Sequence, residues 1–177
     1  MTVEIGSTVP EFQLKGIDGQ SHALRDLRGG QATVVFFSCN HCPYVHAWEE
    51  RLIGLQRDYL AKGVHFIAIN ANDAQAYPDD SFEQMIARAA GKGYNFPYLR
   101  DESQQTARAY GAQRTPEVFL LDAELKLRYH GAPDDNYEDP DQVSQHYLKD
   151  ALEAVLAKGT PAIQETPPVG CTIKWKG

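Results

Sequence analysis

The segment Ala32–Ser38 is a run of β-branched and aromatic residues without the polar spacing of a helix. Such a run predicts a strand that is buried on both faces, at the centre of a sheet. Directly after it, apolar residues such as Val45, Trp48 and Leu52 recur at intervals of three and four. This spacing predicts an amphipathic helix from about Pro43 to Lys62. A central strand that leads at once into a helix requires a fold in which helices cover the sheet.

The rest of the chain continues this alternation of strands and helices. We expect strands at Val64–Asn70, Glu117–Asp122 and Leu125–His130, and helices at Ser81–Lys92, Ser103–Tyr110 and Gln145–Ala157. Only Ala123 and Glu124 separate the last two strands, which predicts an antiparallel hairpin. The first thirty residues are expected to form an N-terminal β-hairpin extension with a helical turn at Leu24–Leu27. This order predicts an α/β fold, a three-layer α/β/α sandwich with a mixed central sheet.

The length of 177 residues suits one domain with additions rather than two domains. We expect the domain to span residues 1–158 and an extended C-terminal tail, residues 159–177, to pack on it. Three prolines in this tail argue against regular structure there. The acidic segment Gly131–Asp141 lacks the glycine and glutamate spacing of a calcium loop, so it is expected to be a solvated loop.

The chain has 17 lysine and arginine residues against 24 aspartates and glutamates, which gives a formal charge of −7. This acidity argues against nucleic acid and anionic membranes as partners. The longest wholly apolar runs, Val34–Phe37 and Val118–Leu121, are far shorter than the ~18 residues of a membrane-spanning helix. The N-terminus lacks the basic start and apolar stretch of a secretory signal, so we expect the protein in the cytoplasm.

Cys39 and Cys42 fall at the junction between the central strand and the amphipathic helix. The chain has three cysteines, an odd count for a disulfide framework, and a close pair in a reducing compartment more often serves catalysis or metal binding. At such a turn the two sulfurs can reach disulfide distance, and the helix N-terminus favours the reactive thiolate. A protonated His41 would favour the thiolate further. The sequence therefore predicts a redox-active dithiol, with His41 in the catalytic site.

Two other interpretations of the pair are inert buried cysteines and a zinc site completed by His41, His46 or Cys171. Structural zinc sites normally carry a second closely spaced pair of ligands, which this sequence lacks. A redox dithiol without a metal or a tightly bound cofactor is therefore the favoured interpretation. A metal-binding or redox-sensing module is the non-enzyme alternative.

The strand-end pair Cys39-x-x-Cys42, the dipeptide Thr115-Pro116 before the strand Glu117–Asp122, and the order of elements together resemble the thioredoxin superfamily. Within it, the chain is most similar to the redoxin branch. That branch includes the alkyl hydroperoxide reductase/thiol-specific antioxidant proteins and the thiol:disulfide interchange proteins. The resemblance covers roughly Val3 to Lys158.

The resemblance implies a thiol:disulfide oxidoreductase that acts on disulfide-containing protein substrates and is recycled by a dithiol donor. It implies that Cys39 attacks the substrate and that Cys42 closes the internal disulfide. It also implies that Pro116 is cis and that Thr115 offers backbone hydrogen bonds to an incoming peptide beside the cysteines.

The proton acceptor for this chemistry is not evident. Many thioredoxins bury an acidic residue six positions before the first cysteine, and the corresponding residue here is Thr33. His41 or a water molecule could accept the proton instead.

The same residues are also compatible with a peroxidase. Pro43 suits the first helical position, which would make Cys42 the N-cap residue and expose it most to the helix-end field. This arrangement resembles a peroxiredoxin, whose active-site arginine would correspond by position to Arg114. Against it, Pro116 stands where peroxiredoxins lack a proline, and Cys39 replaces the hydroxyl that orients the peroxide. We therefore favour dithiol exchange over a thiol-dependent peroxidase with Cys42 as peroxidatic cysteine.

The tail ends in the segment 170–175, Gly-Cys-Thr-Ile-Lys-Trp, which resembles the tails of a subgroup of redoxins. One hypothesis makes Cys171 a third redox thiol that resolves a mixed disulfide or a sulfenate at the pair. The other, which the sequence favours, makes Cys171 a small buried residue that anchors the tail beside Ile173 and Trp175.

Overall fold

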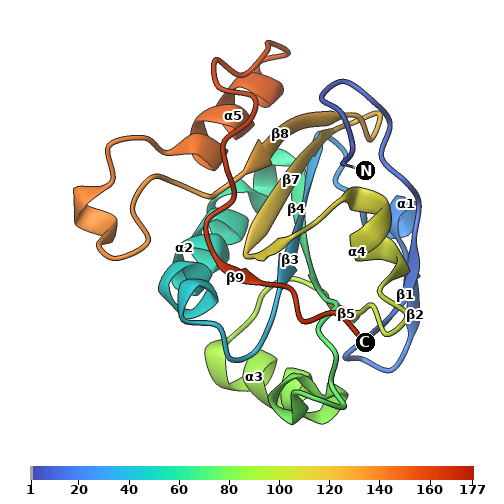
Figure 1. Cartoon of the computed structure of the whole chain (residues 1–177). Helices are drawn as coiled ribbons and strands as arrows, with labels where there is room; N and C mark the ends of the chain where they lie inside the picture. The colour runs from blue at the N-terminus through green and yellow to red at the C-terminus, as the bar shows by residue number, and fades with distance from the viewer. Residues whose placement is uncertain (1) are drawn as a thin grey trace.

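A seven-stranded mixed sheet with helices on both faces forms the body of the protein in the computed structural model, which describes residues 2–177 (Figure 1). Met1, the first residue of the predicted domain 1–158, lies outside the described residues. The strands of this sheet follow the order β2-β1-β5-β4-β3-β7-β8. They are β1 (Gln13–Gly16), β2 (Ser21–Ala23), β3 (Ala32–Ser38), β4 (Val64–Asn70), β5 (Tyr98–Arg100), β7 (Glu117–Asp122) and β8 (Leu127–Gly131). The predicted α/β/α sandwich with an N-terminal hairpin is confirmed.

The helices and a second, small sheet complete the fold. The α-helices are α1 (Leu24–Leu27), α2 (Pro43–Tyr59), α3 (Phe82–Lys92), α4 (Gln105–Tyr110) and α5 (Tyr147–Leu156), and the 3₁₀ turns are η1 (Leu60–Lys62), η2 (Pro78–Asp80) and η3 (Pro140–Gln142). The small sheet pairs β6 (Arg114–Thr115) with β9 (Cys171–Thr172), so it joins the main body to the C-terminal tail. Within residues 2–177, no helix combines the length and apolar character needed to cross a bilayer.

The strand β3 lies at the middle of the sheet, as its composition predicts. All of its residues are buried, and it pairs in parallel with β4 on one side and antiparallel with β7 on the other. Its side chains alternate between two apolar clusters. Val34 and Phe36 enter the cluster under α2 and α5, whereas Val35 and Phe37 enter the cluster on the opposite face, with α1 and α4. This alternation is the two-residue period of a strand, and it holds both helical layers in place.

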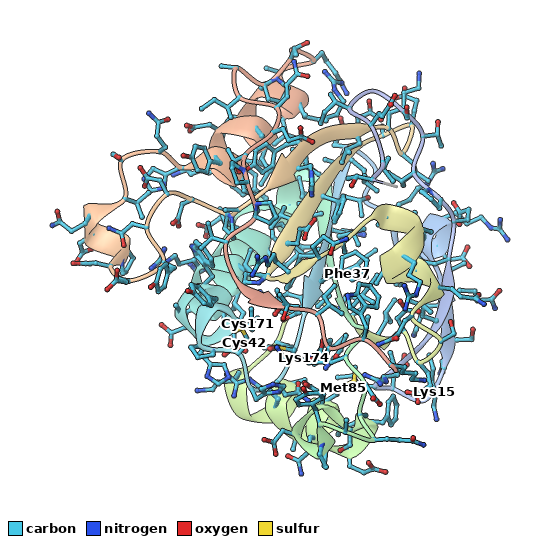
Figure 2. All side chains as sticks on the ribbon, in the orientation of Figure 1. Lys15, Phe37, Cys42, Met85, Cys171 and Lys174 are labelled. Carbon is cyan, nitrogen blue, oxygen red and sulfur yellow. The ribbon has the colours of Figure 1, made fainter. Side chains whose placement is uncertain are left out.

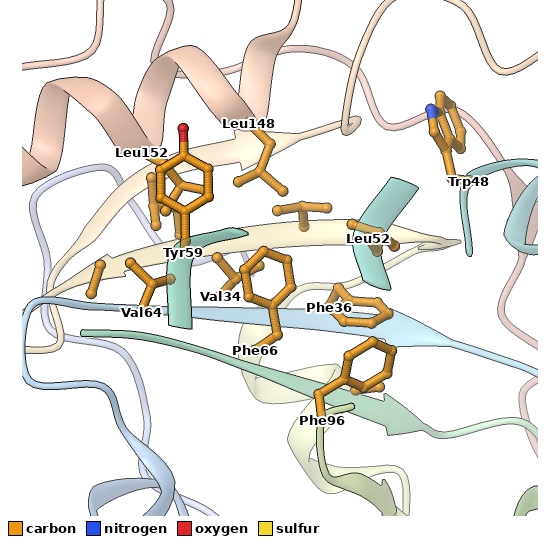
Figure 3. Close-up of a cluster of buried hydrophobic side chains, with 14 of the residues drawn as sticks. Val34, Phe36, Trp48, Leu52, Tyr59, Val64, Phe66, Phe96, Leu148 and Leu152 are labelled. Carbon is orange, nitrogen blue, oxygen red and sulfur yellow. The ribbon is translucent and has the colours of Figure 1, made fainter. Parts of the chain in front are cut away.

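The first of these clusters anchors the helix that follows the dithiol. Figure 3 shows Leu52 of α2 beside Phe36 of β3, with Trp48 of α2 and with Leu148 and Leu152 of α5 higher in the view, and all five belong to one buried cluster. Burial of side chains of this size contributes about 1.5–3 kcal/mol each to stability. The start of α2 is therefore held rigidly against the end of β3.

Short elements differ most from the sequence prediction. The three-residue strand β5 was not expected, because a strand this short has no periodicity of its own and depends on pairing with β4 and β1. The strand β8 begins at Leu127 rather than Leu125, because Leu125 has a φ of 62° and belongs to the hairpin turn. Similarly, α4 begins at Gln105, after Gln104 with a φ of 65°.

The acidic segment 131–141 is only partly a solvated loop, which corrects the expectation for it. Asp134 is buried, where it accepts hydrogen bonds from Trp48 Nε1 at 2.9 Å and from Arg51 Nη1 at 2.8 Å. A buried carboxylate requires such partners, and the prediction from composition alone could not supply them. This contact ties the loop to α2.

Candidate active site

Cys39 and Cys42 lie between the end of β3 and the start of α2. Cys42 is the N-cap residue of α2, and Pro43 occupies the first helical position. Both cysteine side chains are only 1% exposed. Proline is favoured at this position because it needs no amide partner, so the sequence fixes the start of the helix directly after Cys42. The dithiol is therefore preorganised at the positive end of the α2 dipole.

The loop before β7 lies against both sulfurs. Cys39 Sγ is 3.5 Å from Thr115 Oγ1, and Cys42 Sγ is 3.4 Å from the Thr115 carbonyl oxygen. The Thr115–Pro116 peptide bond is cis, as the resemblance implied. The structure thus brings together four of the residues predicted for the site.

Cys171 is the third sulfur at this place. In the small sheet it stands opposite Thr115, and it packs with Cys39, Cys42 and Tyr44. Figure 2 shows Cys171 of the tail next to Cys42. All three cysteines are free thiols in this structure. Ile173 and Trp175, beside which Cys171 was expected to anchor the tail, pack instead on the core cluster of β3 and α4.

Cys42 is the sulfur that its surroundings favour as a thiolate. Hydrogen bonding from the Cys39 thiol lowers the pKa of Cys42 most, and the Cys171 thiol and the Val45 N–H act in the same direction. Together they outweigh burial, which disfavours the charge. The Thr115 carbonyl acts against the thiolate, because a carbonyl oxygen can only accept a proton.

Cys39 has the opposite environment. Its role as donor to Cys42 raises its pKa most, and burial and the negative charge of Asp80 raise it further. The Thr115 hydroxyl opposes these effects. Burial and the contact with Cys42 also raise the pKa of Cys171, to about 11. The three sulfurs therefore divide into one candidate nucleophile and two protonated neighbours.

The alkylation of Cys42 should depend little on pH. Because the neighbouring thiols lower its pKa well below the usual thiol range, Cys42 should be a thiolate at neutral pH. We expect the iodoacetamide rate constant of the reduced protein to stay within about threefold between pH ~6 and ~8, whereas an ordinary thiol loses about tenfold per pH unit. Stopped-flow alkylation with peptide mapping measures it. A rate that rises tenfold per unit, as for free cysteine, would contradict the thiolate assignment.

Asp80 is a candidate site residue that the sequence did not reveal. It is fully buried at the end of η2, beside Cys39. Its carboxylate is oriented by donors at Asn40 N (2.7 Å), Asn70 Nδ2 (3.1 Å) and Asn72 Nδ2 (3.0 Å). Many thioredoxins carry their buried acid at the position of Thr33 in β3. Here a buried acid near the first cysteine comes instead from Asp80 in η2. Thr33 itself accepts a hydrogen bond from Gly29 N.

His41 connects this carboxylate to the surface. Its Nδ1 is shielded from solvent and lies 2.7 Å from Asp80 Oδ2, although it makes no aligned hydrogen bond among the described residues. The ring is about one-third exposed and stacks on Tyr77. The Cys39 sulfur, a ring nitrogen of His41 and a carboxylate oxygen of Asp80 all lie within 4.8 Å of one another. His41 therefore lies between the buried carboxylate and solvent, where a proton from the dithiol would leave the site.

The same three residues could be considered as metal ligands. The 2.7 Å separation of His41 and Asp80 is shorter than the ~3.3 Å between two ligand atoms on a tetrahedral zinc ion. The Asp80 oxygens also already accept three hydrogen bonds from asparagines 40, 70 and 72. This geometry suits a proton-sharing pair better than a metal centre.

Two further candidates lie at the edge of the site. Arg114, the candidate peroxide-site residue, is exposed, and its Nη1 donates to the Gly170 carbonyl at 3.2 Å. Its guanidinium therefore binds the tail. His46, a candidate zinc ligand, is exposed on α2, and its Nε2 lies 2.8 Å from the Asn40 carbonyl.

Glu117, His130 and Glu165 form a network that binds the backbone at the start of β6. Glu117 accepts hydrogen bonds from the backbone N–H groups of Gln113 and Arg114, and its other oxygen lies 2.6 Å from His130 Nε2. His130 Nδ1 lies 3.2 Å from Glu165 in the tail. Burial disfavours a charged His130, but these two carboxylates outweigh it and raise its pKa above 6.5.

The stabilisation by His130 should fade at alkaline pH. Because its pKa is raised on folding, its contribution is complete below the unfolded value of 6.5 and is lost as pH rises through the folded value. We expect His130→Gln to lower the urea midpoint more at about pH 6 than at about pH 9. Urea unfolding of both proteins at the two pH values measures this, and an equal loss at both would contradict it.

A mixed sheet with a dithiol at the β3–α2 junction, beside a cis proline, defines the thioredoxin superfamily and its redoxin branch. Residues 5–130 match the model of the AhpC/TSA family, and the chain belongs to this family. The predicted membership is thereby confirmed.

Three proteins of known sequence or structure are similar to this chain. Thiol-disulfide oxidoreductase ResA of Geobacillus thermodenitrificans (strain NG80-2) is 30% identical over 128 residues, which cover 71% of this chain and 68% of that protein. The crystal structure of an uncharacterized conserved protein from Geobacillus kaustophilus matches with a TM-score of 0.93 and 41% identity, over 99% of this chain and 94% of that one. A hypothetical protein from Sinorhizobium meliloti 1021 matches with a TM-score of 0.93 and 37% identity, over 100% and 97%.

Proposed function

We propose that this protein is a thiol:disulfide oxidoreductase in which Cys42 attacks a substrate disulfide and Cys39 closes the internal disulfide. The observation that carries this proposal is the position of Cys42, the N-cap residue of α2, between the Thr115 main chain and two thiols. The relative named a thiol-disulfide oxidoreductase supports the reaction class. This order of attack differs from the one that the resemblance implied, in which Cys39 comes first.

The reaction begins when the Cys42 thiolate attacks one sulfur of a substrate disulfide. A mixed disulfide forms, and the other half of the substrate leaves as a thiolate. The helix N-terminus stabilises the Cys42 thiolate before this step and also favours its departure later. The residues around Thr115 accept the substrate chain.

Cys39 must lose its proton before it can attack the mixed disulfide. Asp80, beside Cys39, and His41, which reaches solvent, together provide an acceptor. The new thiolate attacks Cys42 Sγ, the Cys39–Cys42 disulfide forms, and the substrate leaves reduced by two electrons. A dithiol donor then restores the reduced protein.

The test compares a disulfide with hydrogen peroxide as oxidants of the reduced protein. We expect oxidised insulin or a model peptide disulfide to react at least about tenfold faster than peroxide, because Arg114 binds the tail and is not hydrogen bonded to Cys42. A faster reaction with peroxide would favour the peroxidase. Metal analysis of anaerobically purified protein is the second arm, and equimolar zinc would contradict a dithiol enzyme.

A further inference from the structure

The tail strand β9 occupies the free edge of β6. Among the described residues, β6 has no other strand neighbour, and β9 pairs with it antiparallel, with Arg114 opposite Thr172 and Thr115 opposite Cys171. Figure 1 shows the tail running from α5 past α2 to β9. The N–H of Arg114 donates to Glu117 and not to β9, so the edge of β6 that an extended peptide could pair with is the one that β9 now occupies.

Contacts on both sides of Cys171 hold the strand in register. Before it, the Gly170 carbonyl accepts from Arg114 Nη1. After it, Ile173 is buried and donates its N–H to the Gln113 carbonyl at 3.0 Å. Farther on, Lys174 is bound through its own N–H and carbonyl to Asn72 and Asp73. The tail is thus a docked element of the site.

Gly170 fits a space without room for a side chain. A Cβ at this position would lie 2.0 Å from the Thr115 carbonyl oxygen. Because the atom in the way belongs to the backbone, a side-chain rotation cannot relieve this clash. Any larger residue would therefore push β9 away from β6. By contrast, a Cβ at Gly159, also in the tail, would make an ordinary 3.5 Å contact with the Ala154 carbonyl.

The docked strand delivers Cys171 to the candidate nucleophile. Cys171 packs against Cys42 and is itself partly exposed. Cys42 is only 1% exposed. The tail therefore both covers the thiolate and offers it a thiol, at the place where a substrate sulfur must arrive.

We propose that the tail is a built-in substrate strand: β9 occupies the edge that a disulfide-bearing peptide would pair with, and Cys171 forms a disulfide with Cys42 during turnover. This inference rests on the proposed function. It makes Cys171 a resolving cysteine and makes tail release a condition for the entry of an extended substrate.

The reaction balances with a substrate disulfide as the oxidant. Cys42 attacks it and forms a mixed disulfide, and one substrate thiolate leaves. The tail then docks, Cys171 loses its proton to solvent, and its thiolate attacks Cys42 Sγ. The Cys42–Cys171 bond forms, the second substrate thiolate leaves, and two electrons have passed to the substrate. Cys39 can then displace Cys171, which moves the disulfide to the Cys39–Cys42 pair without further oxidation.

The disulfide itself is tested in the Cys39→Ser protein. After reduction and addition of one equivalent of a small peptide disulfide, we expect mass mapping to show a Cys42–Cys171 bond. A stable mixed disulfide between Cys42 and the probe, with Cys171 free, would overturn the inference and leave the proposed function standing. An unmodified Cys42 would instead overturn the proposed function.

The docking is tested with Gly170→Ala and the matched control Gly159→Ala. We expect a maleimide attached to polyethylene glycol to label Cys42 about tenfold faster in Gly170→Ala than in wild type, because undocking exposes the thiolate. Gly159→Ala should keep the wild-type rate. A wild-type rate in Gly170→Ala would overturn the covering role. Should that variant unfold by circular dichroism, Cys171→Ala, which removes the covering thiol alone, must show faster labelling or the inference fails.

Discussion

Cys42→Ser should lose disulfide exchange almost completely, with the rate constant for insulin reduction falling by about 10⁴-fold or more. The hydroxyl of serine is not ionised at neutral pH, so no thiolate remains at the start of α2. The assay uses excess dithiol donor, with the donor's own rate subtracted. A variant that keeps a tenth of wild-type activity would show that another sulfur attacks.

The control for this prediction is Cys39→Ser. It removes one of the two resolving thiols but leaves Cys42 at the helix N-terminus, so the first attack should continue while turnover slows. We expect a burst of two equivalents of released thiol per protein, because Cys171 can still resolve the mixed disulfide, followed by slow steady-state reduction. Cys42→Ser should show no burst. If the two variants exchanged these behaviours, the order of attack implied by the family resemblance would be correct.

Asp80→Asn should slow turnover by about 100-fold without slowing the first attack. The substitution keeps the size of the side chain but removes the charge that can accept the proton of Cys39. We expect the burst to match wild type within about twofold, and the second step to become faster with rising pH as hydroxide replaces the lost acceptor.

The matched control is the neighbouring Asp79→Asn. Asp79 is exposed and lies in the same turn η2, so this substitution removes the same charge without changing a buried residue. It should leave both steps unchanged. Equal losses of turnover in the two variants would mean that turnover depends on the charge of the turn and not on the position of Asp80 beside Cys39. A pH profile that Asp80→Asn leaves unchanged would contradict a role in proton transfer.

The long elements could be predicted because each carries its own pattern. The apolar run of β3 and the spacing of Val45, Trp48 and Leu52 in α2 are properties of adjacent residues. The strands β5 and β9 could not be predicted, because two or three residues become a strand only through the partner beside them. The tail was expected to lie on the body, but its pairing with β6 depends on tertiary structure.

The site residues also divide into those with a local sequence pattern and those that depend on tertiary structure. The cysteine pair and Thr115-Pro116 were visible because each is a short motif with its own chemistry. Asp80 was not, because it reaches Cys39 through the parallel pairing of β3 with β4 and the turn η2 that follows. Its one signal in the sequence was the acidic pair Asp79-Asp80 immediately before Ser81, which caps α3. The cytoplasmic location and the absence of a cofactor stay predictions.

The most direct measurement of the central claim is the identity of the sulfur that holds the substrate. In the double variant Cys39→Ser and Cys171→Ser, neither resolving thiol remains, so the first mixed disulfide should accumulate. The reduced variant is treated with one equivalent of a labelled peptide disulfide, quenched with acid and mapped by mass spectrometry. The account predicts one peptide per protein, attached to Cys42. The contradicting result is a protein that carries no peptide in this variant but accumulates it on Cys39 when Cys42 is the residue replaced by serine.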